Sequence, residues 1–310
     1  MKILFMGTPD FAVFSLKALV EAGEDVIGVI TQPDKPKGRG YTMTPPPVKV
    51  YAEQMGLPVW QPTTLRDESF AELLAELAPE LIAVVAYGKI LPESVIKYPK
   101  YRCVNVHGSL LPEYRGAAPM QRAIIDGKET TGITTMYMDV GLDTGDMILK
   151  EEISIEDSDN FESIHDKLGA LGADMLVRTV ALIKEGKAPA EKQEDALATY
   201  AAKIEKSDCL IDFSRSAREI HCLIRGLSPI PLSFTHTADG KLLKVVSAER
   251  VDRDFDAPAG TVVSLENGGI TVACGDGAVK LTAVLPEGKG RMPAADFIRG
   301  RKVALGDILK

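Results

Sequence analysis

The sequence predicts an α/β protein with a doubly wound, mostly parallel sheet, followed by a smaller part built as a β-barrel. In the first half, short apolar, β-branched runs alternate with segments of helical periodicity. Repeated strand–helix units form parallel sheets with helices on both faces. After residue 208 the pattern changes to short strands separated by Asp-Gly and Asn-Gly-Gly turns, which is typical of small barrels.

The elements of the first half follow from these patterns in order. An apolar run at 2–6 ends at Gly7, and Thr8 is expected to cap a helix that has Pro9 in its first turn and ends near Gly23. Ligands of such sheets bind at the carboxyl ends of the strands, so the residues after each strand are the ones to examine. The further expected strands are 26–31, 81–87 and 102–106, and the expected helices are 48–55 and 67–77.

The second half begins with one long expected helix at 160–187, followed by a polar connector. A helix at 216–225 and strands at 242–247, 261–265, 269–274 and 278–285 are expected after it. At 310 residues a single core is close to its practical size limit. We therefore expect a first domain at 1–189, a linker at 190–207 and a second domain at 208–310.

The composition, 45% apolar and 26% charged residues, is that of an ordinary globular protein. The longest apolar run, 81–87, is too short to cross a bilayer, and the first residues turn polar before a signal peptide is complete, so we expect a cytoplasmic protein. The four cysteines form no CxxC pair, which argues against a zinc site or a disulfide framework. The net charge is −8, yet residues 205–310 hold 15 Lys and Arg against 14 Asp and Glu, which indicates either a polyanion-binding part or a chance fluctuation.

The strand expected at 102–106 contains Asn105 near its end and is followed by His107, an amide and an imidazole two residues apart that can point to the same side of a sheet. The acidic, turn-rich loop 139–146 can return a carboxylate, Asp143, to the imidazole. Taken singly, these residues also fit a structural histidine, a strand-end cap and a turn former. The first strand–helix turn is not GxGxxG and no Walker loop is present, which argues against a dinucleotide oxidoreductase.

Together with their neighbours, these residues resemble the 10-formyltetrahydrofolate-dependent formyltransferases. The resemblance rests on Asn-x-His followed by Gly-Ser-Leu-Leu-Pro, on Arg-Gly-Ala-Ala-Pro at 115–119, on Gly-x-Asp-Thr-Gly-Asp at 141–146, and on the segments 5–9 and 86–92. It covers nearly the whole chain and implies a Rossmann-like catalytic domain followed by an OB-like barrel. It is looser after the linker, where Ile230 stands between two prolines in place of an expected tryptophan.

The resemblance implies transfer of a formyl group from 10-formyltetrahydrofolate to an amine, through a tetrahedral intermediate and with no metal. Asn105 would stabilise the oxyanion, His107 would assist it or relay protons, and Asp143 would orient and charge the imidazole or accept the amine proton. Plain core packing is the alternative for Leu110 and Leu111. The implied folate site consists of Ser109, Leu110, Leu111 and Pro112, a second wall of Tyr87, Ile90 and Leu91, and the backbone of Asp139, Val140, Gly141 and Leu142.

The acceptor is a separate question, because related enzymes formylate glycinamide ribonucleotide or aminosugar nucleotides. The long loop 32–47 carries Lys35, Lys37 and Arg39 and is expected to bind the acceptor end of a tRNA, with a solvated lid as the alternative. We expect a monomer that formylates methionyl initiator tRNA; an aminosugar-nucleotide formyltransferase and a non-catalytic folate- or RNA-binding protein are the alternatives. Basic residues of the second domain that could follow phosphates are Lys280, Lys289, Arg291, Arg299, Arg301 and Lys302.

Overall fold

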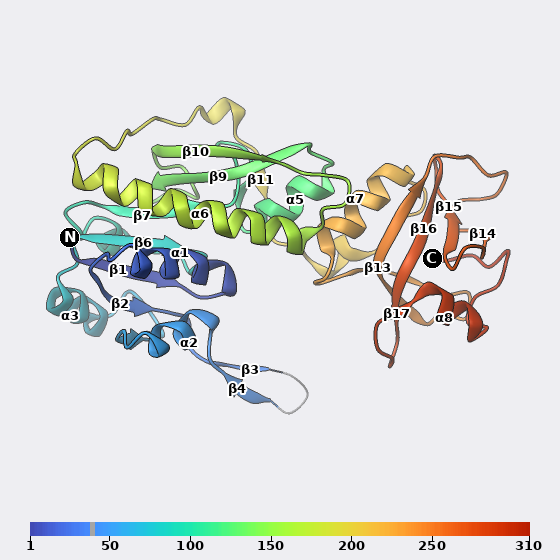
Figure 1. The fold of residues 1–310 in the computed structure, drawn as a ribbon, viewed down its shortest axis with the longest axis horizontal. Coiled ribbons are helices and arrows are strands. Elements are labelled where there is room, and N and C mark those ends of the chain that lie inside the picture. Colours follow the sequence, from blue (N-terminus) through green and yellow to red (C-terminus); the bar gives the residue numbers. More distant parts are fainter. Residues whose placement is uncertain (38–40) are drawn as a thin grey trace. The chain divides into compact units, whose positions relative to one another are not determined.

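The computed structural model describes residues 1–37 and 41–310 and divides into two compact units, which are described separately (Figure 1). Unit 1 comprises Met1–Gly116, Thr131–Ile153 and His165–Tyr200. Unit 2 comprises Ala117–Thr130, Ser154–Ile164 and Ala201–Lys310. The segment 190–200, which the sequence places in a linker, therefore belongs to unit 1.

Unit 1 is built on a seven-stranded sheet in the order β10-β9-β7-β6-β1-β2-β5. The strands from β7 to β5 run parallel, whereas β9 is antiparallel to β7. The central strands are fully buried aliphatic runs, as a sheet covered on both faces requires. Their bounds are β1 (Ile3–Gly7), β2 (Val26–Ile30), β5 (Val59–Trp60), β6 (Leu81–Val85), β7 (Cys103–His107), β9 (Thr130–Tyr137) and β10 (Met147–Ser154).

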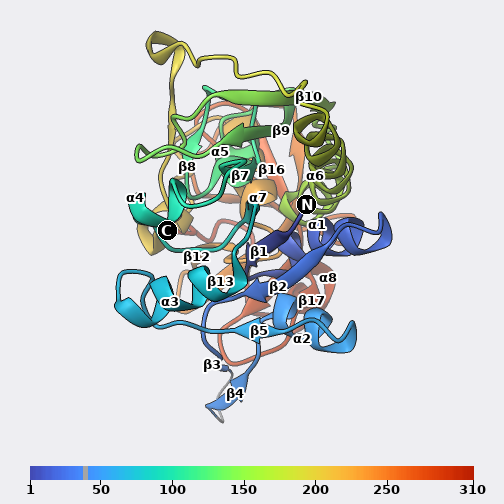
Figure 2. The same cartoon turned by 90° about the vertical axis from the view of Figure 1, so that its left-hand side faces the viewer.

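Helices cover both faces of this sheet (Figures 1 and 2). On one face, Leu4 and Ile82 share a buried cluster with Phe70 of α3. On the other face, Gly172 of α6 lies so close to Val106 of β7 that a Cβ there would stand 2.9 Å from the valine Cγ1, so glycine allows the helix to close on the sheet. The bounds are α1 (Asp10–Glu21), α2 (Pro47–Gln54), α3 (Glu68–Leu77), α4 (Glu93–Ile96) and α6 (Phe161–Lys184).

Hydrogen bonds tie the carboxyl ends of β1, β2 and β6 together. The Thr8 hydroxyl donates to the Tyr87 carbonyl oxygen at 2.9 Å, and the Gln32 side-chain amide donates to the same oxygen at 3.3 Å. The prediction that Thr8 caps α1 is therefore wrong. Pro9 occupies the N-cap position, and the threonine hydroxyl is used across the sheet edge instead.

Unit 2 contains an antiparallel half-barrel with strand order β12-β13-β16-β15-β14 and β17 beside β16. The helix α7 packs on β13 and α5, and it begins with a capping box in which Ser216 and Glu219 bond reciprocally. The bounds are α5 (Pro119–Ile125), α7 (Ala217–Leu227), α8 (Ala294–Arg299), β12 (Ser233–His236), β13 (Leu242–Val251), β14 (Val262–Ser264), β15 (Ile270–Ala273), β16 (Ala278–Pro286) and β17 (Met292–Pro293).

Two small two-stranded pairs complete the fold. A hairpin projects from the body of unit 1, formed by β3 (Lys35–Lys37) and β4 (Thr42–Thr44) (Figure 1). The second pair joins β8 (Arg115–Gly116) to β11 (Tyr200–Ala201). Among the described residues, no helix is both long enough and apolar enough to cross a membrane.

The ion pair between Asp10 of α1 and His165 of α6 generates a prediction about stability. The His165 Nε2 lies 3.4 Å from Asp10 Oδ1, and the hydrogen bond to Asp10 is the main cause of a raised pKa of His165. A raised histidine pKa contributes stability that is complete below the unfolded value of about 6.5 and is lost as the pH rises through the folded value. Asp10 is ionised at pH 6 and above, because its pKa is lowered. The ion pair is therefore present at pH 6 and is lost at high pH, where His165 is neutral.

We expect Asp10→Asn to lower the free energy of unfolding at pH 6 by roughly 0.5 kcal/mol more than at pH 9, a small effect because Asp10 is mostly exposed. Urea unfolding of both proteins at the two pH values measures this difference. Equal destabilisation at pH 6 and pH 9 would contradict it, because the helix N-terminal effect of Asp10 does not change over that range.

Candidate active site

Strand β7 places Asn105 and His107 on the same face of the sheet, at the edge where the parallel strands end. Asn105 lies opposite Val84 of β6 and Met136 of β9 and is partly exposed. Within the part of the chain that the structure describes, its side-chain amide has no hydrogen-bond partner. The amide N–H groups are therefore available to a ligand.

The imidazole of His107 is buried, and its geometry fixes which nitrogen carries the proton. Nε2 lies 3.0 Å from the carbonyl oxygen of Tyr114. A carbonyl oxygen can only accept a hydrogen bond, so Nε2 carries the proton and donates it. In the neutral ring, Nδ1 then has a free lone pair, and it faces Asp143 Oδ2 at 3.7 Å.

The carboxylate of Asp143 is held by the backbone on the other side. Its Oδ2 accepts a hydrogen bond of 2.8 Å from the amide N–H of Gly116. The 3.7 Å separation between Oδ2 and His107 Nδ1 is longer than a hydrogen bond. The carboxylate therefore stands where it would meet a proton arriving at Nδ1.

Two backbone groups and one distant side chain complete this arrangement, and the sequence did not reveal them as functional. The carbonyl of Tyr114 holds His107, the amide of Gly116 holds Asp143, and the Gln193 side chain donates to the carbonyl oxygen of Asp143 at 2.7 Å. Backbone groups carry no side-chain signature. Gln193 lies 50 residues from Asp143 in a polar connector, where composition indicates only a loop.

The residues expected around the folate separate into buried and exposed groups. The side chains of Tyr87 and Leu91 are buried in the cluster that includes Phe70 of α3, and Leu111 packs against Met136 and Met147. These three are therefore core residues rather than an open wall. Burial raises the pKa of Tyr87 to about 12, so its hydroxyl stays protonated. The apolar side chains left exposed are Ile90 at 81%, Val140 at 61% and Leu142 at 58%.

Hydrogen bonds fix the Ser109-Leu110-Leu111-Pro112 turn. The Ser109 hydroxyl donates to the Glu113 carbonyl at 2.6 Å, and the Thr134 hydroxyl donates to the Ser109 carbonyl at 2.7 Å. Leu110 and Pro112 are partly exposed, and the peptide bond between Leu111 and Pro112 is cis. The two hydrogen bonds hold the turn to its own next residues and to β9.

The backbone of the 139–142 segment lies on the surface, as an open ligand-binding edge requires. Asp139 folds back so that its carboxylate accepts from the Val140 N–H at 2.7 Å. Gly141 and Gly145 allow the tight return of the loop, because a Cβ at Gly145 would lie 1.7 Å from the Tyr137 carbonyl oxygen.

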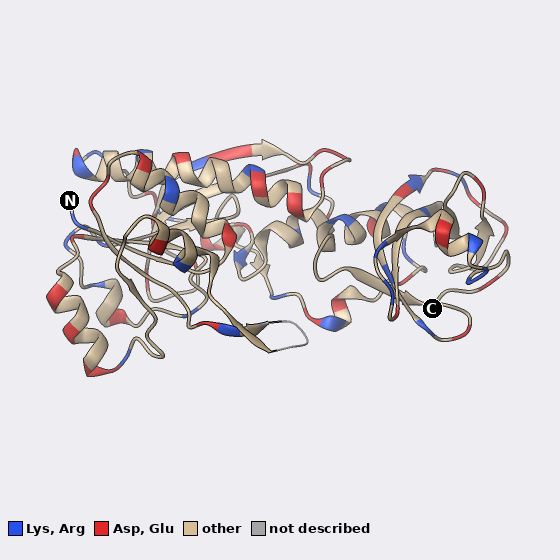
Figure 3. Ribbon diagram, turned by 60° about the horizontal axis from the view of Figure 1, so that its bottom comes forward, with Lys and Arg blue, Asp and Glu red and all other residues tan. Residues whose placement is uncertain are grey.

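The basic loop expected to bind tRNA forms the β3–β4 hairpin, which carries Lys35 and Lys37 on its first strand. Arg39 lies outside the described residues. At the base of the hairpin, Asp34 accepts hydrogen bonds from Lys49 at 3.0 Å and from Gln61 at 2.8 Å, which anchors the entering chain to α2 and to the end of β5. Figure 3 shows acidic and basic residues adjacent in sequence where the chain enters this hairpin.

The basic residues of unit 2 are distributed over its strands, α8 and loops rather than along one stripe (Figure 3). Lys280 lies 3.4 Å from Glu249, and Arg299 pairs with Asp296. Part of the positive charge expected to follow phosphates is therefore balanced by neighbouring carboxylates.

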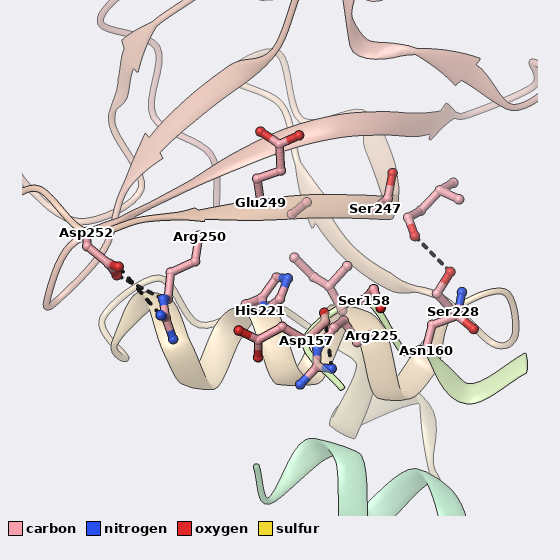
Figure 4. A pocket seen from close by; sticks show the side chains of 13 residues that line it. Asp157, Ser158, Asn160, His221, Arg225, Ser228, Ser247, Glu249, Arg250 and Asp252 are labelled. Atoms are coloured by element: carbon pink, nitrogen blue, oxygen red, sulfur yellow. Dashed lines mark hydrogen bonds and ion pairs between the residues drawn. The ribbon is translucent and has the colours of Figure 1, made fainter. Parts of the chain in front are cut away.

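A separate cavity of about 480 Å³ lies within unit 2, between α7, β13 and the 157–160 segment (Figure 4). Both of its arginines have partners within the protein: Arg225 donates to the carbonyls of Glu156 and Asp159, and Arg250 pairs with Asp252 at 2.8 Å. Burial lowers the pKa of His221, which favours the neutral ring. Asn105, His107 and Asp143 do not line this cavity and lie in unit 1.

No group of three or more potential metal ligands occurs among the residues that the structure describes. The arrangement in unit 1 combines a free hydrogen-bond donor, a nitrogen base with a defined tautomer and a carboxylate beside it. This combination supports proton transfer and stabilisation of a developing oxyanion.

Solved structures with similar folds include formyltransferases that act on sugars. The sugar 3N-formyl transferase WlaRD matches with a TM-score of 0.66 and 19% identity, over 93% of this chain and 98% of its own. HypX from Aquifex aeolicus, solved with tetrahydrofolic acid, matches with a TM-score of 0.64 and 16% identity, over 96% of this chain and 47% of its own. At these identities the likeness concerns the fold.

Sequence comparison is more specific. The formyl transferase family model matches residues 1–180, and the model of the formyl transferase C-terminal domain matches residues 203–302. The methionyl-tRNA formyltransferase of Geotalea daltonii is 50% identical over 99% of this chain and 97% of its own length. That of Bacillus subtilis is 47% identical over 99% of this chain and 97% of its own. The chain belongs to the methionyl-tRNA formyltransferase family.

Proposed function

We propose that the protein transfers the formyl group of 10-formyltetrahydrofolate to the α-amino group of methionyl initiator tRNA. The observation that carries this proposal is the convergence of Asn105, His107 and Asp143 at one sheet edge, in a chain of this family. The reaction belongs to translation initiation, so we place the protein in the cytoplasm, and we keep a monomer as our expectation.

The transfer forms a bond between the amine nitrogen and the formyl carbon and breaks the bond from that carbon to N10 of the folate. Asn105 donates its amide N–H to the oxyanion of the tetrahedral intermediate, because its donors are not used within the protein. His107 accepts the amine proton at Nδ1, since Nε2 is already protonated and bound to Tyr114. The same proton is then returned to N10 as it leaves.

Asp143 stabilises the imidazolium that forms in this step. Its Oδ2 faces Nδ1 at 3.7 Å, so a proton on Nδ1 brings a hydrogen bond and a favourable charge interaction within short reach. The Gly116 amide keeps the carboxylate on that side of the ring throughout. His107 therefore works as a base whose charged form is compensated locally.

The donor site fits a flat, partly apolar ring bound at the strand ends. Ile90, Val140 and Leu142 expose apolar side chains, and the 139–142 backbone offers surface N–H and C=O groups to a pterin edge. We propose contacts with Ser109, Leu110 and Pro112 along the turn after β7. Tyr87, Leu91 and Leu111 support this surface from the core.

For the acceptor, we propose that the β3–β4 hairpin grips the end of the tRNA through Lys35, Lys37 and Arg39. An aminosugar nucleotide as acceptor would leave this anchored basic hairpin without a role. The sugar formyltransferases are below 20% identical to this chain, whereas methionyl-tRNA formyltransferases reach 50%. A formyl-transfer assay that compares charged initiator tRNA with aminosugar nucleotides tests the choice directly.

The catalytic roles predict that Asn105→Ala, His107→Ala and Asp143→Asn each lower kcat for formyl transfer by about 100-fold or more. Each change removes an oxyanion donor, the base or the countercharge, none of which is needed to hold the folate. Single-turnover formylation measures the rate, and titration with a folate analogue measures binding, which should change by less than about threefold.

Asp174→Asn, which neutralises an exposed carboxylate of α6, is the matched control and should leave kcat unchanged. A near-normal rate in the His107 or Asp143 variant would exclude that residue from the mechanism.

The hairpin role predicts that replacing Lys35, Lys37 and Arg39 with alanine sharply lowers kcat/KM for methionyl-tRNA and leaves folate-analogue affinity within about twofold. The salt dependence should also become less steep, because fewer phosphates are neutralised. Lys17→Ala, on the exposed side of α1, controls for the loss of a positive charge. If the triple variant keeps the wild-type rate and salt slope, the hairpin is only a lid.

The chemistry also predicts that formyl transfer needs no metal ion, because the donor carbon is already activated on the folate and the proton passes through His107. Activity with pre-charged tRNA should survive EDTA. Reproducible loss of activity that a single divalent ion restores, with the tRNA fold checked separately, would show that a metal site takes part.

A further inference from the structure

We propose that Gln193 is a positioning residue that fixes Asp143 opposite His107 and thereby sets the turnover rate; this inference rests on the proposed function. Gln193 is partly buried between two exposed neighbours of a polar segment. Its side chain reaches the catalytic loop, although it touches neither His107 nor the carboxylate itself.

The side-chain amide of Gln193 uses both of its N–H donors and its oxygen acceptor. The NH₂ group donates one hydrogen to the Asp143 carbonyl at 2.7 Å and the other to the Gly145 carbonyl at 2.8 Å. The oxygen accepts from Arg115 Nε at 3.0 Å. Only a side-chain amide offers two donors and an acceptor in this arrangement, so neither Glu nor Met can replace it.

The Asp143 backbone needs this support, because its φ of +53° lies in the left-handed region. That conformation is unfavourable for a residue with a Cβ. A hydrogen bond to the Asp143 carbonyl stabilises the peptide in this orientation, which aims the side chain at the Gly116 amide and at His107.

The segment that carries Gln193 is itself fastened on both sides. Glu191 forms a two-hydrogen-bond bridge with Met147 at the start of β10. Thr199 accepts from the Tyr114 amide at 2.8 Å through its hydroxyl and from the Arg115 amide at 2.9 Å through its carbonyl. We call residues 191–199 the strap.

The strap therefore contacts both pieces of chain that hold the catalytic groups. Through Gln193 it fixes the loop of Asp143, and through Thr199 it fixes Tyr114, whose carbonyl orients His107. Arg115 links the two contacts: its buried guanidinium also pairs with the exposed Asp195 at 2.7 Å. The distance between His107 and Asp143 is thus set by a segment that contains neither residue.

The experiment compares Gln193→Glu and Gln193→Met with wild type. Gln193→Glu keeps an acceptor for Arg115 but turns a carboxylate toward two carbonyl oxygens, whereas Gln193→Met removes every hydrogen bond at similar volume. We expect both to lower kcat by about 10- to 100-fold, because displacements near 1 Å in an active site cost rate on this scale. KM for methionyl-tRNA and for the folate should change by less than about threefold.

A purely structural role through Arg115 gives the opposite result for Gln193→Glu, which would then turn over at the wild-type rate and overturn the inference. In an Asp143→Asn background, Gln193→Met should lower kcat by less than about threefold further, because its effect passes through Asp143. Full additivity of the two changes would also overturn it.

Lys192→Met is the matched control, since it changes the exposed neighbouring residue of the strap and should leave kcat at the wild-type value. The thermal unfolding midpoint of each variant shows that the fold is kept. If wild type formylates an aminosugar nucleotide instead of methionyl-tRNA, the proposed function fails, but the same kcat comparison with that acceptor still tests Gln193.

Discussion

The geometry of the candidate active site depends on one hydrogen bond, from Nε2 of His107 to the carbonyl oxygen of Tyr114. Because a carbonyl cannot donate, this bond assigns the proton to Nε2 and leaves Nδ1 as the basic atom. It also fixes the plane of a ring that is buried among protein atoms. The positions of Asp143 and Asn105 have a chemical meaning only once this tautomer is set.

The short segment Tyr114-Arg115-Gly116 holds both ionisable members of the site. It accepts from the histidine, donates to the aspartate and sends the arginine toward Gln193. Tyr114 and Gly116, two positions apart, thus link His107 and Asp143, which lie 36 residues apart in sequence. A single carbonyl oxygen also joins several strand ends of the sheet: that of Tyr87 accepts hydrogen bonds from both Thr8 and Gln32.

The aliphatic runs of the sequence predicted the parallel strands β1, β2, β6 and β7, because full burial on both faces requires such runs. Helical periodicity predicted α1, α2 and α3, whereas the short elements α4 and β5 were not predicted. The strand β9 was not predicted. It is rich in threonine, and Thr134 and Thr135 are buried because their hydroxyls bond to Ser109 and Thr179. A polar strand of this kind is stable only with partners that come from elsewhere in the fold, and local pattern does not reveal them.

The same limit applies to the site. Asn105, His107 and Asp143 have side chains that indicate chemistry, so their roles could be proposed from motif and resemblance. The carbonyl of Tyr114 and the amide of Gly116 act through atoms that every residue possesses. Tyr87 could be assigned to the wall of a folate site from the sequence, but only the structure shows that its side chain is buried in the core.

The anchor at Asp34 separates the β3–β4 hairpin mechanically from the sheet. Lys49 and Gln61 clamp the chain before the hairpin begins, so the sheet edge is closed below it and does not rely on the residues above. Under the proposed acceptor role, the hairpin is therefore a separate module, whose length and charge can change while the frame that holds Asn105, His107 and Asp143 is kept. Acceptor choice and formyl chemistry can evolve at different rates within one chain.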